Sequence, residues 1–94
     1  MPRMKPKARE DLTVVELDGE AVIYDEVGGD LHHLNSSATI IFALCDGTQT
    51  VKHMSAEIAD ALSIPPQEVE PQVRTVVRDL RSAGLLDEER LAPR

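Results

Sequence analysis

The chain has 94 residues, of which 41% are hydrophobic, and it carries a formal net charge of −7. This length allows one small domain and leaves no room for a second. A single cysteine, Cys45, excludes an internal disulfide bond. The sequence has no signal-peptide pattern and no apolar run of about 18 residues, so we expect a cytoplasmic protein with no membrane partner.

The charge is unevenly distributed. Residues 1–9 hold four basic residues and no acidic one, which leaves six basic against 17 acidic residues, a net of −11, in the rest of the chain. An acidic body argues against general affinity for nucleic acid. With two prolines and no apolar run, residues 1–11 are predicted to form a basic, disordered tail. The alternative is an arm that contacts an acidic partner.

Three short strands are predicted first. Residues 12–17 (LTVVEL) are rich in β-branched side chains, and Asp18-Gly19 is a favoured hairpin turn before a second strand at residues 20–25. A glycine-rich turn at residues 27–30 leads to a short third strand, LHHL, at residues 31–34. Tight turns between consecutive strands predict an antiparallel meander.

Three helices are predicted next. Asn35 or Ser36 can cap the first, which Asp46-Gly47 ends, and Thr50 can cap the second. The third should run from about residue 67 to residue 83. The apolar stripes expected to face the core are Ala38, Ile41, Phe42 and Cys45; Val51, Met54, Ile58, Ala61 and Leu62; and Val69, Val73, Val76, Leu80 and Ala83.

Two further features concern the third helix. Pro71 has no N–H to donate to the carbonyl of Gln67, so the first turn is expected to be kinked or detached. After Gly84, Leu85 and Leu86 can fold back onto the core. The order of elements predicts an α+β, winged helix-turn-helix-like fold over residues 12–87, in which a three-stranded antiparallel sheet precedes a three-helix bundle. Residues 88–94 are expected to be a frayed tail.

The residues that could carry chemistry do not form a recognisable site. His32 and His33 are neighbours on a strand and point to opposite faces, so they cannot bind one metal ion together. Cys45 lies on an apolar helix stripe, where free cysteine usually acts as a small buried hydrophobe. We therefore expect no enzyme activity, no cofactor and no metal.

A cationic stripe lies on the third helix. Arg74, Arg78 and Arg81 are spaced by four and three residues, which places them within about 60° of arc. Val77 is expected between this stripe and the buried face. Valine beside arginine makes a rim that can hold an apolar side chain and pair with an acidic one.

The middle of the chain resembles the PqqD family. The residues that carry the resemblance are Leu34, Asn35, Ala38, Ile41, Leu44, Cys45, Asp46, Gly47, Thr50 and Val51. Downstream, the register continues through Met54, Ile58, Leu62, Ile64, Pro66, Val73, Leu80, Gly84 and Leu85. The resemblance covers roughly residues 12–87 and implies the same winged-helix-like fold.

The resemblance also implies a function. Members of the family are RiPP recognition elements: they bind the leader region of a ribosomally made precursor peptide and present it to a modifying enzyme, typically a radical SAM protein, as in PQQ biosynthesis. They have no catalytic activity of their own. The leader adds a strand to the third strand's edge, a mode called β-augmentation, and lies against the third helix. An open edge could also pair with a second copy and form a homodimer.

Mapped onto this sequence, the family's site has two walls. The strand edge is Asp30, Leu31, His32, His33 and Leu34. The helix wall is Val73, Arg74, Val77, Arg78 and Arg81. This arrangement predicts a leader with apolar anchors and at least one acidic residue facing the arginines. Changing Arg74 and Arg78 to glutamate should then weaken binding by about tenfold, ~1.4 kcal/mol.

Two other functions stay open on the sequence. A winged helix can bind DNA, with the third helix in the major groove and the same arginines on phosphates or guanines. The net charge of −11 outside residues 1–9 argues against this. The chain could also be a structural subunit of a larger enzyme.

Overall fold

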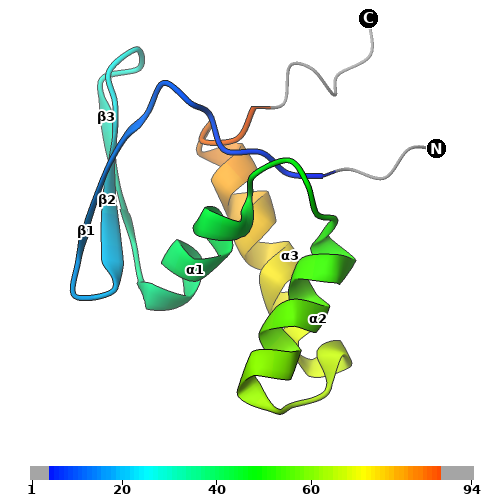
Figure 1. Cartoon of the computed structure of the whole chain (residues 1–94). Helices are drawn as coiled ribbons and strands as arrows, with labels where there is room; N and C mark the ends of the chain where they lie inside the picture. The colour runs from blue at the N-terminus through cyan, green and yellow to red at the C-terminus, as the bar shows by residue number, and fades with distance from the viewer. Residues whose placement is uncertain (1–4, 88–94) are drawn as a thin grey trace, which may run out of the picture.

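The computed structural model describes residues 5–87. Three strands, β1 (Thr13–Leu17), β2 (Glu20–Asp25) and β3 (Asp30–Leu34), precede three helices, α1 (Ser36–Leu44), α2 (Val51–Leu62) and α3 (Pro66–Ser82). All three helices lie on one side of the sheet (Figure 1). The predicted α+β order, with an antiparallel sheet followed by three helices, is confirmed.

The sheet is an antiparallel meander in the order β1-β2-β3. The β1–β2 turn places both Asp18 and Gly19 at positive φ, 56° and 80°, which is the geometry that matches the twist of a two-residue hairpin. Along β2, Ala21 and Ile23 are buried while Val22 is exposed. The sheet therefore covers the helices with one face and leaves the other face uncovered.

The helix starts follow the local sequence closely. Of the two predicted candidates, Asn35 caps α1: its side-chain oxygen accepts from the N–H of Ala38 at 2.8 Å. The hydroxyl of Thr50 accepts from the N–H of His53 at 3.1 Å and caps α2. Gly47 follows α1 with φ +86°, a conformation that glycine adopts without a steric penalty.

The core lies between the sheet and the helices. Its most enclosed side chains include Ile23 from β2 and Met54 from α2, each 0% exposed. Leu85 and Leu86 are buried, so the expected return of the chain onto the core is confirmed. The cluster is completed by Ala21, Leu34, Ile41, Cys45, Ala59, Val69, Val73, Val77 and Leu80.

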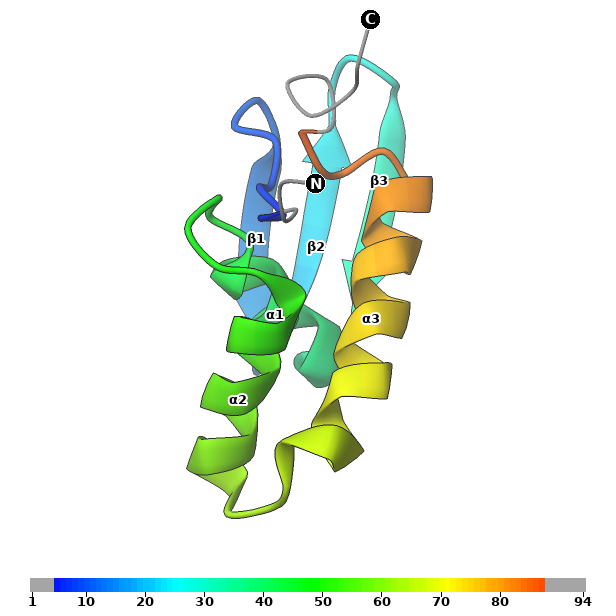
Figure 2. The same ribbon diagram turned by 90° about the vertical axis from the view of Figure 1, so that its right-hand side faces the viewer.

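The buried faces of α2 and α3 differ from the predicted stripes. On α2, Ser55 and Ala59 are buried, whereas Leu62 is 61% exposed and Ala61 is exposed. Leu62 is exposed because it is the last residue of α2, and α2 ends beside the loop to α3, far from the sheet (Figure 2). On α3, Ala83 is exposed.

Pro71 does not detach the start of α3. The helix runs without interruption from Pro66 through Pro71 to Ser82. Pro71 and Gln67 are both exposed. Water can therefore take the place of the helical partner that the Gln67 carbonyl loses.

Residues 5–11 do not form part of the disordered tail that the sequence predicts at residues 1–11. Pro6 is buried, Ala8 donates its N–H to the Cys45 carbonyl at 2.7 Å, and Asp87 donates its N–H to the Lys7 carbonyl at 2.6 Å. Backbone bridges pair Lys7 with Asp46 and Ala8 with Leu86. We call residues 5–11 the N-terminal segment; it crosses the end of the helical layer (Figure 1). Residues 1–4, and the predicted C-terminal tail at residues 88–94, lie outside the described residues.

Arg9 ties the N-terminal segment to the sheet. Its guanidinium donates to Asp25 at 2.9 Å, to Asp11 at 2.8 Å and to the Gly84 carbonyl at 2.8 Å. The hydrogen bonds from Arg9 lower the pKa of both carboxyls, and that of Asp25 is lowered further by the N–H of Gly28. Arg9 is thus engaged within the chain rather than held out as a contact arm.

Candidate functional site

Strand β3 forms one edge of the sheet. It pairs with β2 along one side, from Asp25–Asp30 to Ala21–Leu34, and no other strand within residues 5–87 pairs with its outer side. An unpaired edge presents a row of backbone N–H and C=O groups to a further strand. The predicted edge from Asp30 to Leu34 therefore exists as an open ladder.

A groove of about 520 Å³ lies between β3 and α3. We call it the β3–α3 groove. Its sheet side is Leu31 to Leu34, and its helix side comes from one face of α3 together with Leu85. The α3 residues that line it are Val76, Asp79 and Leu80, and the C-cap residue Ala83 follows them.

This helix wall is not the predicted one. Val73 and Val77 are 1% and 2% exposed, so they lie in the core, and Val77 is not on an open rim as expected. None of the three arginines lines the β3–α3 groove. The sequence did contain a signal for the actual wall, because Val76, Leu80 and Ala83 belong to the predicted apolar stripe. Periodicity alone, however, predicts that the whole stripe faces the core.

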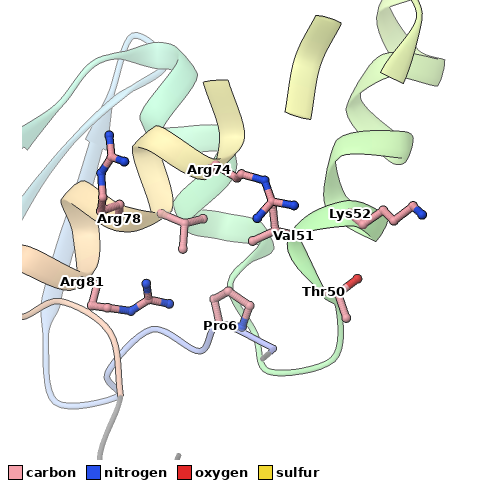
Figure 3. Close-up of a pocket in the computed structure, with 8 residues that line it drawn as sticks. Pro6, Thr50, Val51, Lys52, Arg74, Arg78 and Arg81 are labelled. Atoms are coloured by element: carbon pink, nitrogen blue, oxygen red, sulfur yellow. The ribbon is translucent and has the colours of Figure 1, made fainter. Parts of the chain in front are cut away.

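The arginines line a second hollow, of about 600 Å³, which we call the cationic pocket. Its residues are Pro6, Thr50, Val51, Lys52, Arg74, Val77, Arg78 and Arg81. Figure 3 shows the side chains of Arg74 and Arg81 extending toward Val51 and Pro6, with Arg78 turned away from them. The structure therefore divides the predicted site residues between two flanks of α3.

The two strand histidines behave as the alternation predicts. His33 is exposed, and its Nε2 lies 2.8 Å from a carboxylate oxygen of Glu20. His32 is half-buried in the β3–α3 groove. Its Nε2 is enclosed and has no hydrogen-bond partner among the residues that the structure describes.

Cys45 and Asp46 have structural roles. The Cys45 thiol is buried and lies 3.2 Å from the Ile41 carbonyl oxygen, to which it donates. Burial raises its pKa to about 11, which keeps it protonated and poorly nucleophilic at neutral pH. Asp46 accepts from the hydroxyl and the N–H of Thr48, and these bonds lower its pKa.

Residues 5–87 lack two other kinds of feature, a metal-binding cluster and a membrane-spanning helix. No group of three or more His, Cys, Asp or Glu side chains is placed to hold a metal ion. None of the helices in this range is long and apolar enough to cross a membrane.

Comparison with protein families gives a match over residues 20–86, to the family described as coenzyme PQQ synthesis protein D (PqqD). The chain belongs to the PqqD family. The match begins with β2 and ends at Leu86, so it includes β3, all three helices and both walls of the β3–α3 groove. The comparison with curated proteins gave no match.

Two solved structures share the fold of this PqqD-family chain. TbiB1 in complex with the TbiA(beta) leader peptide has a TM-score of 0.74 at 21% identity, covering 86% of this chain and 94% of that one. A lasso peptide synthetase B1 complexed with the leader peptide has a TM-score of 0.74 at 17% identity, covering 88% and 98%. At these identities the likeness shows the fold.

Proposed function

We propose that this chain binds the leader region of a ribosomally made precursor peptide as an added strand on β3. The observation that carries the proposal is the open β3 edge beside the β3–α3 groove. An extended peptide can bond to the edge through its backbone, while alternate side chains enter the groove and give selectivity. Family membership and two neighbours that hold leader peptides support this choice.

The groove favours an apolar anchor. Val76, Leu80 and Leu34 line it, and Val76 keeps part of its side chain accessible. Burying an apolar side chain of the leader there contributes about 1.5–3 kcal/mol. The proposed anchor therefore packs between the strand and the helix.

The polar groups of the groove change the expected leader. Asp79 is exposed on the helix wall, and the three arginines lie elsewhere. We therefore expect a neutral or basic residue beside the anchor, in place of the acidic residue expected from the sequence.

Calorimetry with a synthetic leader tests the proposal. The leader is taken from the short open reading frame nearest the gene of this chain. Val76→Glu should weaken binding by about tenfold or more, ~1.4 kcal/mol, because it places a second carboxylate beside Asp79 at the position proposed for the apolar anchor. Circular dichroism confirms that the variant is folded.

The matched control is the double change Arg74→Glu with Arg78→Glu. It alters two exposed residues on the same helix that do not line the groove. We expect leader affinity to stay within about twofold of the parent value. A loss of affinity in this control equal to that in folded Val76→Glu would move the peptide to the other flank of α3 and overturn the proposal.

The partner that receives the peptide is a modifying enzyme in this proposal, of the radical SAM or another type. The chain itself contributes binding and presentation, with no chemical step. The same β3 edge can also pair with the edge of a second copy, which would form a homodimer and block the groove. Light scattering across a concentration series, with and without leader, tests for a dimer that the leader dissociates.

A further inference from the structure

The cationic pocket is a concentration of positive charge on an acidic protein. Lys52, Arg74, Arg78 and Arg81 line one hollow of about 600 Å³. The chain outside residues 1–9 has only six basic residues against 17 acidic ones. Four of the six therefore meet in a single pocket, although they come from two different helices.

The pocket also has an apolar floor. Pro6 is buried, Val77 is 2% exposed and Val51 is half-buried, and all three line it. Figure 3 shows Pro6 and Val51 between the arginines of α3 and Lys52 of α2. An apolar floor with a cationic rim fits an apolar side chain that has carboxylates on either side.

Three of the four cations of the rim, Lys52, Arg74 and Arg78, are held weakly or not at all by ion pairs among residues 5–87. Arg74 pairs with Glu70 four residues earlier, and the Arg74 side chain is 64% exposed. Exposed pairs at this spacing contribute only a few tenths of a kcal/mol. Lys52 and Arg78 are exposed and have no ion-pair partner among residues 5–87. An incoming carboxylate therefore displaces little.

We propose that the cationic pocket docks a short acidic segment of a partner protein, with one apolar side chain on the Val51–Val77 floor and carboxylates on Lys52 and Arg74. The acidic body repels the long phosphate backbone of a nucleic acid, whereas a short segment meets only the local positive field. The apolar floor gives an acidic segment an advantage over a free phosphate. This surface is separate from the β3–α3 groove, so the proposal does not depend on leader binding.

The two sites can be filled at the same time. Val73 and Leu80, which are 1% and 2% exposed, lie on α3 among the core residues. Within residues 5–87, no residue lines both the β3–α3 groove and the cationic pocket. A peptide strand on β3 therefore leaves the cationic pocket accessible to a second protein.

NMR titration of the ¹⁵N-labelled full chain tests the proposal. The probe is the peptide acetyl-Glu-Glu-Leu-Glu-Glu-amide, and the matched probe has glutamine at all four glutamate positions. We expect the acidic peptide to shift the amides of residues 50–52 and 74–81, with an affinity about tenfold above that of the glutamine peptide. Its affinity should fall as salt is raised.

Variants separate the surface from the fold. Lys52→Glu with Arg74→Glu should lower the affinity for the acidic peptide by about tenfold, because each change replaces an attraction by a repulsion. Both positions are exposed, so the variant should keep the parent's amide spectrum elsewhere. Glu57→Lys, an exposed change on α2 outside the pocket, is the control and should leave the affinity unchanged.

Three results would overturn the proposal. One is an equal response to the glutamine peptide. Another is a set of shifts confined to β3. The third is equal occupancy by inorganic phosphate at the same concentration, which would make the pocket a simple anion site. Leader binding, measured separately, is unaffected by all three, so its failure and the failure of this proposal can be told apart.

Discussion

The two flanks of α3 differ in what they face and in how they are built. One flank carries Val76 and Asp79 and forms a groove with an open strand edge. The other carries Arg74 and Arg78 and forms a pocket with the start of α2. The first flank offers backbone hydrogen bonds and the second offers positive charge. One helix can therefore serve two different ligands because a single buried stripe separates its flanks.

Both flanks depend on one core, and loss of the core should have the largest effect. Met54 is 0% exposed in the cluster that also contains Val73 and Leu80 of α3. Met54→Ala should lower the free energy of unfolding by about 2–5 kcal/mol, through lost burial and the cavity that remains. Urea unfolding measures this change.

Leu62→Ala is the matched control, because Leu62 is apolar, lies on the same helix and is 61% exposed. Its cost should stay within about 0.5 kcal/mol. If both variants lost the same stability, α2 would not contribute its Met54 face to a shared core.

The N-terminal segment lines the cationic pocket through Pro6 and contributes no residue to the β3–α3 groove, and Gly47 tests this difference. Gly47 has φ +86°, donates its N–H to the Pro6 carbonyl at 2.9 Å, and an added Cβ would lie 3.3 Å from Lys7 Cδ. Gly47→Ala should cost about 1–2 kcal/mol in unfolding free energy from the left-handed backbone alone. It should also speed amide hydrogen exchange at Ala8 and weaken binding of the acidic peptide, while leader affinity is kept.

Gly19→Ala separates backbone strain from the contact with Lys7. Gly19 has φ +80°, but nothing lies within 4 Å of an added Cβ. We expect a similar loss of stability without faster exchange at Ala8. If hydrogen exchange at Ala8 became equally faster in both variants, exchange there would report global unfolding and not the contact between Gly47 and the N-terminal segment.

The parts of the fold that were predictable are encoded locally. Asn35 caps α1 because its side chain reaches an N–H three residues on, and Asp18-Gly19 turns because its backbone takes positive φ. The open edge of β3 was also predictable from the sequence, because a meander of three strands leaves two strand edges unpaired. Each of these signals lies within a few residues of the structure that it produces.

The parts that were wrong depend on distant partners. Periodicity placed the α3 arginines on one stripe, but it could not say which neighbour that stripe faces. The N-terminal segment is held by Cys45, Asp46 and Leu86, about 40 to 80 residues away in the chain, through backbone groups whose bonding leaves no side-chain pattern. Val77 is buried in the core cluster and not on the rim, because helical periodicity does not show how far neighbouring elements cover a given position.

Asn35 belongs to the groove flank, and removing its cap should have a smaller effect. Asn35→Ala loses the bond to the Ala38 N–H and should cost about 1 kcal/mol of unfolding free energy. Because Asn35 also lines the groove, leader affinity should fall slightly, with the acidic peptide unaffected. Thermal unfolding measures the cost in stability. Ser36→Ala, at the other predicted cap position, should leave the unfolding free energy nearly unchanged.

The smallest effect should come from removing the Asp25 charge, because the Arg9 guanidinium keeps Asp11 and the Gly84 carbonyl as partners. Hydrogen bonds from Arg9 hold the pKa of Asp25 below its ordinary value of 3.8. A carboxyl whose pKa is lowered by folding stabilises the folded state above its unfolded pKa, and this contribution is lost as the pH falls through the lowered value. Thermal unfolding from pH 7 to pH 2 should therefore show stability declining below about pH 4. Asp25→Asn should lie below the parent protein at neutral pH and approach it in acid, since both then lack the charge. A constant offset at every pH would assign the effect to packing, and the N-terminal segment would then be held without help from this ion pair.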